Sequence, residues 1–143
     1  MHFISLPPWV PLLAFGLVCG GAFWRGGWPE RATAAALLVS WVLTLLLRDR
    51  SWSHPQWAAF VIDLAFGAFI LALALKSDRY WPLWAAGFHL LAIATHFARQ
   101  IDPTLGNWAY VTANVIWTYL VLGALAVGVT GAARARAAGR SVA

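Results

Sequence analysis

Four polar side chains interrupt the long apolar stretches of this sequence: Asp63, His89, His96 and Asn114. A charged group in hydrocarbon costs at least about 2.5 kcal/mol, so an acid in such a place indicates a functional site with a partner. A carboxyl group beside an imidazole can hold and pass a proton. The pattern therefore predicts a polar pocket or proton-active site that opens outward, with Asp63 paired to His96. The alternative is a hydrogen-bonded cluster that only holds helices together.

Helix geometry places three of these residues at a similar depth. Asp63 and Asn114 each follow, by less than two turns, a tryptophan that starts an apolar stretch. At the rise of an α-helix, both lie on the order of 10 Å below the same boundary. His96 lies about one turn below that boundary, and His89 lies two turns deeper on the same face of its helix.

Paired histidines make haem an alternative use of His89 or His96. Two axial ligands approach a haem from opposite faces, which one helix cannot arrange, so a second copy or another subunit would complete the site. No cofactor is therefore predicted. Asp63 and His96 supply two ligands where zinc uses three or four protein ligands, so no metal site is predicted either.

Motifs of catalysis are missing from the sequence. It has no His-Glu-x-x-His, Gly-x-Ser-x-Gly or Cys-x-x-Cys motif, and no phosphate-binding glycine loop. No catalytic residue is assigned, and the expectation is a protein that is not an enzyme.

Five apolar stretches must position the polar cluster. The chain has 143 residues, of which 62% are apolar and 10% charged, whereas soluble domains are about a quarter charged. A membrane-crossing helix needs roughly 20 apolar residues. Proline, tryptophan and charge bound such stretches at about 3–24, 29–47, 56–75, 81–98 and 107–129. Because the connections are short, we expect an all-α, up-and-down bundle of five transmembrane helices within 1–131.

Aromatic residues lie near the ends of these stretches. Most of the ten tryptophans, Trp81 and Trp84 among them, are placed there, as is Tyr110. Amphipathic rings prefer the level of the lipid headgroups, so these residues are predicted to form two aromatic belts.

Basic residues predict the orientation. On one side of the membrane the pattern places Arg25, Arg31, Lys76, Arg79, Arg134, Arg136 and Arg140. The other side has Arg48, Arg50 and Arg99. The positive-inside rule then puts the N-terminus outside and residues 132–143 in the cytoplasm as a basic tail, in a bacterial inner membrane. Because the charges lie at the ends of apolar stretches, we expect anionic lipid headgroups as partners and no nucleic acid.

Small residues predict close helix packing at two places. Gly16 and Gly20 form a Gly-x-x-x-Gly face, and Gly123 and Gly128 form a similar stripe. Such faces let helices approach closely, either within the bundle or against a partner helix.

The leading expectation for function is an accessory, assembly or scaffold subunit of a larger membrane complex, or a homo-oligomer. The second is a small channel, transporter or proton-responsive sensor that uses Asp63, His89, His96 and Asn114. A third is a haem- or pigment-associated redox subunit. The direction in which Asp63 faces separates the first two: toward an interior pocket for the second, against a partner subunit for the first.

Overall fold

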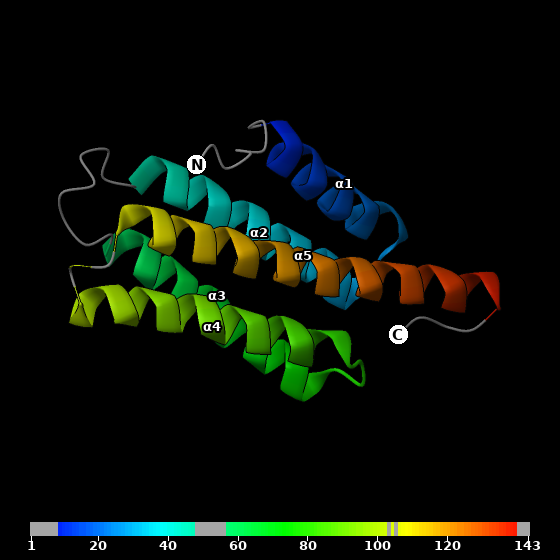
Figure 1. The fold of residues 1–143 in the computed structure, drawn as a ribbon. Coiled ribbons are helices and arrows are strands. Elements are labelled where there is room, and N and C mark those ends of the chain that lie inside the picture. The colour runs from blue at the N-terminus through cyan, green and yellow to red at the C-terminus, as the bar shows by residue number, and fades with distance from the viewer. Residues whose placement is uncertain (1–8, 48–56, 103, 105, 140–143) are drawn as a thin grey trace.

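Five α-helices make up the fold in this computed structural model, which describes residues 9–47, 57–102, 104 and 106–139. The helices are Trp9–Arg25 (α1), Trp28–Leu47 (α2), Trp57–Lys76 (α3), Trp81–Ile101 (α4) and Asn107–Ala137 (α5) (Figure 1). No strand occurs among the residues described. The predicted all-α class with five helices is confirmed.

The helix boundaries follow local sequence signals. Gly26 and Gly27 separate α1 from α2, and Pro82 lies in the first turn of α4, where its missing N–H costs nothing. Two helices are longer than predicted. Helix α4 continues past 98 to Ile101, and the next residue, Asp102, has an extended backbone (φ −122°, ψ 91°) that is typical of a residue before proline. Helix α5 continues past 129 to Ala137, because its alanines and arginines favour helix.

The helices pack as a closed ring in chain order. Helix α1 contacts α2 and α5, the pairs α2–α3, α3–α4 and α4–α5 complete the ring, and α2 also contacts α5 across it. Successive helices are antiparallel (Figure 1), so each end of the bundle collects the same set of helix ends. We call these the Trp9 end, where α1 starts and α2 ends, and the Arg25 end, where α1 ends and α2 starts.

Three helices are long and apolar enough to cross a membrane: α2, α3 and residues Trp108–Ala137 of α5. Helix α1 is shorter within the described residues, and the first part of the predicted span 3–24 lies outside them. Helix α4 carries His89, His96 and Arg99, which lower its hydropathy. Large apolar side chains such as Leu17, Leu46 and Leu75 are about three-quarters exposed on the outside of the bundle.

The tightest packing lies toward the Arg25 end. There Ile70, Leu125 and Trp81 are buried in one cluster with small residues of other helices, among them Ala22 and Ala34. Alanines let the backbones approach closely, and the large side chains then fill the space between them. The Trp9 half of the bundle has fewer buried side chains, and it is here that the polar residues of α3, α4 and α5 meet.

Candidate functional site

Three side chains from three helices form a hydrogen-bonded chain. Asp63 of α3 contacts His96 of α4, with Oδ2 and Nε2 2.7 Å apart. The other ring nitrogen of His96, Nδ1, lies 2.9 Å from the hydroxyl of Tyr110 on α5. With a neutral imidazole and an ionised Asp63, the Tyr110 O–H donates to Nδ1 and the Nε2–H donates to the carboxylate. Each group thus orients the next, as in a general acid–base relay.

His96 is held in a packed position. Only 6% of the residue is exposed, whereas 28% of the Asp63 side chain is. The Phe60 ring packs against the imidazole at a centroid distance of 5.9 Å, and the Tyr110 ring packs edge-on at 5.4 Å. The imidazole is therefore fixed by rings on two sides, while the carboxylate is the more open member of the pair.

His89 binds the backbone beside Asp63. Its Nε2 lies 2.7 Å from the carbonyl oxygen of Asp63, and because a carbonyl only accepts, Nε2 carries the proton. Gly67, one turn further along α3, makes this approach possible. A Cβ atom there would lie 2.9 Å from the end of the Ile93 side chain and 3.2 Å from the His89 ring. The phenyl ring of Phe66 also packs edge-on against His89 at 4.7 Å.

Asn114 does not join the hydrogen-bonded chain. Its amide nitrogen donates to the backbone oxygen of Tyr110, one turn earlier on the same helix, at 3.0 Å. Of the four residues singled out from the sequence, the structure thus brings Asp63, His89 and His96 into direct contact. Asn114 lies on the wall of a cavity that Asp63, His89 and His96 also border.

That cavity has a volume of about 450 Å³ and is bordered by all five helices, but it is only partly enclosed, and border residues such as Leu12 and Trp41 are exposed. Its polar border consists of Ser40, Thr44, Asp63, His89, His96, Tyr110, Asn114, Thr118 and Tyr119. The rest of the border is mainly apolar, with contributions from Leu12, Phe15 and Trp41. The hydroxyl of Tyr119 is buried without a hydrogen-bond partner. Small-molecule sites are typically mainly apolar cavities of about 300–1,000 Å³ with a few polar groups, which matches this one.

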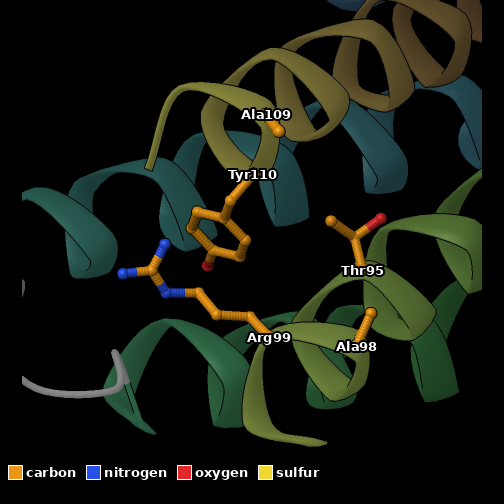
Figure 2. A pocket seen from close by; sticks show the side chains of 5 residues that line it. All are labelled: Thr95, Ala98, Arg99, Ala109 and Tyr110. Atoms are coloured by element: carbon orange, nitrogen blue, oxygen red, sulfur yellow. The ribbon is translucent and has the colours of Figure 1, made fainter. Parts of the chain in front are cut away.

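Tyr110 and Arg99 are functional candidates that the sequence analysis missed. The Arg99 guanidinium carbon lies 4.9 Å from the centre of the Tyr110 ring, a cation–π contact. The two side chains border a second, smaller pocket of about 150 Å³, together with Thr95, Ala98 and Ala109. Figure 2 shows them side by side there. Tyr110 was assigned to an aromatic belt. Tyr110 lies four residues before Asn114, so the two share one helix face. This spacing is the sequence feature that could have placed Tyr110 with the polar cluster.

A second polar cluster, also missed, lies at the Arg25 end. The carboxylate of Glu30 is fully buried and accepts hydrogen bonds from the Trp81 indole N–H at 2.8 Å and the Gly27 amide at 2.7 Å. The Arg79 guanidinium lies 3.4 Å from the same carboxylate. Arg136 near the end of α5 donates to the backbone oxygen of Gly26 at 2.7 Å. This cluster ties the α1–α2 turn to α4 and α5.

The predicted small-residue faces divide into two kinds. Gly128 packs inside the bundle, where a Cβ would lie 2.6 Å from the Trp81 indole nitrogen. Gly16, Gly20 and Gly123 are exposed, and a Cβ at any of them would have no neighbour within 4 Å. The close contact with Gly128 also corrects the assignment of Trp81 to an aromatic belt, because this ring is only 4% exposed.

The surroundings and hydrogen bonds of His89 and His96 bear on whether these residues could bind a metal or haem. Within the described ranges, no three His, Cys, Asp or Glu side chains come together. Both ring nitrogens of His96 and the Nε2 of His89 take part in hydrogen bonds. An iron bound to His96 or to Nε2 of His89 would have to displace one of these partners.

The fold and the site define a class of protein: a five-helix bundle with an apolar exterior and a partly polar interior cavity. Comparison with known proteins found no matching family model, no matching curated protein and no matching solved structure. The functional argument therefore depends on the geometry of this chain alone.

Proposed function

We propose that all five helices cross a bacterial inner membrane, with the Trp9 end outside and the Arg25 end in the cytoplasm. The exposed apolar side chains around the bundle support this arrangement, since they would face lipid. The polar side chains of α4 are no obstacle, because His89 and His96 are buried inside the bundle. Arg25, Arg31 and Lys76 are exposed at the proposed inner side, where the positive-inside rule and anionic headgroups favour them.

We further propose that the protein binds a small amphiphilic molecule in its interior cavity, which is reached from outside at the Trp9 end, as the binding step of a sensor or a transporter. The observation that carries this proposal is the 450 Å³ cavity with the Asp63–His96–Tyr110 chain on its border. A purely structural polar cluster would be expected to be packed on all sides, as Glu30 is. Here the Asp63 side chain borders open space, and it can exchange a proton with His96.

Filling the cavity is expected to abolish ligand binding. Ala92 is buried and borders the cavity, whereas Ala94, two residues later on α4, is exposed on the outside. The protein is purified from native membranes in mild detergent. The small molecules that remain bound are then extracted from it and identified by mass spectrometry. The wild type and Ala94→Phe should retain a common species in near-stoichiometric amount, and Ala92→Phe should lose it. Equal retention by both variants would contradict the proposal.

A second candidate function is that of an accessory subunit docked against a partner helix. The specific observation in its favour is the open Gly16–Gly20 face of α1, which no side chain of the described bundle covers. The same purification tests it, because a partner protein that stays bound to the wild type and is lost from Gly20→Leu would support docking at this face. Purification of the wild type without any partner protein would count against it.

A further inference from the structure

Arg99 carries a positive charge that forms no ion pair within the described part of the protein. Its Nη1 is buried without a hydrogen-bond partner, and the two ion pairs found among the described residues do not include it. A buried donor left unpaired costs about 1–3 kcal/mol, and more when it is charged. The acid nearest in sequence, Asp102, is engaged elsewhere: its carboxylate accepts hydrogen bonds from the amide and the hydroxyl of Thr104.

Tyr110 connects Arg99 to the interior cavity. The tyrosine borders both the large cavity and the small pocket that contains Arg99. In Figure 2 its ring stands beside the Arg99 side chain, with the phenol oxygen on the side of the guanidinium. A group bound at this oxygen would therefore lie next to an unpaired cation and at the edge of a largely apolar cavity.

We propose that the ligand of this cavity carries an acidic group, which binds the Arg99 guanidinium and the Tyr110 hydroxyl while its apolar part occupies the cavity. This inference rests on the proposed binding function and names the class of ligand: an anionic amphiphile. A guanidinium presents a planar fork of N–H donors that matches the oxygens of a carboxylate, sulfonate or phosphate. The acidic group belongs either to a free amphiphilic acid or to a phospholipid.

Binding of such an anion is coupled to a proton. The Tyr110 hydroxyl has one proton, and a neutral His96 already receives it at Nδ1. The hydroxyl can donate to an anion only when Nδ1 carries its own proton, so that His96 donates to both Tyr110 and Asp63. The anion therefore binds together with one proton. Helices α1 and α2 place no titratable side chain on the cavity border. Besides His96, the charged or titratable groups that border the cavity or the small pocket are Asp63, His89, Arg99, Tyr110 and Tyr119.

Three probes with the same eight-carbon tail test the inference: octanesulfonate, octanol and octyltrimethylammonium. Binding to the full chain in nanodiscs of zwitterionic lipid is measured by calorimetry, with empty nanodiscs subtracted. Octanesulfonate should bind most tightly, and Arg99→Gln should weaken it roughly ten- to a hundredfold. Arg31→Gln, an exposed arginine at the other end of the bundle, should leave it unchanged. Calorimetry in two buffers of different ionisation enthalpy measures the protons taken up when octanesulfonate binds. The wild type should take up about one proton per bound ligand, and Tyr110→Phe should take up nearly none.

The outcomes separate this inference from the binding function. Equal binding of the three probes, or equal effects of Arg99→Gln and Arg31→Gln, would overturn the acidic-group inference and leave the cavity proposal standing. Failure of every probe to bind would contradict both. Competition by added phosphatidylglycerol that depends on Arg99 supports the inference and makes the occupant a lipid headgroup. Octanesulfonate binding that phosphatidylglycerol does not affect supports it and makes the occupant a free acid.

Discussion

Replacement of Glu30 by alanine is expected to destabilise the fold by about 2–5 kcal/mol. The substitution leaves the Trp81 indole N–H and the Gly27 amide without their acceptor in a fully buried place. Arg79 adds little to the loss, because its side chain is 23% exposed and its charge can be solvated. Unfolding by sodium dodecyl sulfate in mixed micelles, followed by far-ultraviolet circular dichroism, measures the effect.

Two control variants identify the source of this loss. Glu30→Gln keeps a side-chain oxygen that can accept one of the two hydrogen bonds, so it should lose clearly less than Glu30→Ala. Asp78→Ala removes an exposed acid from the same end of the bundle and should change stability by less than about 0.5 kcal/mol. If Glu30→Ala were as stable as Asp78→Ala, the cluster at the Arg25 end would not hold the bundle together.

The second large effect is expected from Gly128→Ala, which should destabilise the fold by about 1–3 kcal/mol. The new Cβ would lie 2.6–2.7 Å from three atoms of the rigid Trp81 indole, so the ring must shift. That shift also lengthens the hydrogen bond from the indole to Glu30. Thermal unfolding in detergent, followed by circular dichroism, measures the loss.

Gly123→Ala is the matched control for this prediction. Gly123 lies on the same helix, but its Cβ would meet nothing within 4 Å. Alanine favours helix over glycine by up to about 1 kcal/mol, so this variant should be neutral or slightly stabilised. The same loss of stability in both variants would mean that glycine itself, rather than its contact with Trp81, matters in α5.

The helices were predictable because their signals are local. Prolines, paired glycines and charges break the apolar stretches where the described helices begin and end. The contact between Asp63 and His96 was also predictable, because short connections fix antiparallel neighbours and helix rise then fixes their relative depth. The buried position of Glu30 was less evident, because this acid lies at the start of its predicted span, where an exposed carboxylate is also favoured.

The remaining features depend on packing between helices. A tryptophan at a helix start looks the same in the sequence whether it faces lipid, as the exposed Trp84 does, or the core, as Trp81 does. Only the approach of Gly128 from another helix distinguishes the two. A polar pocket at Asp63 and His96 was predicted, but its size and its apolar border were not, because they depend on the space that side chains of five helices leave unfilled.

Cysteine accessibility tests the central claim, an open interior cavity reached from outside, most directly. In a Cys19→Ala background, Ser40→Cys places a thiol on the cavity border, and Val39→Cys places one at nearly the same depth on the exposed face of α2. A membrane-impermeant methanethiosulfonate reagent is added to the outside of intact cells. The account predicts rapid labelling of Ser40→Cys and none of Val39→Cys, which would face lipid. Labelling of neither thiol, or of both equally, would contradict it.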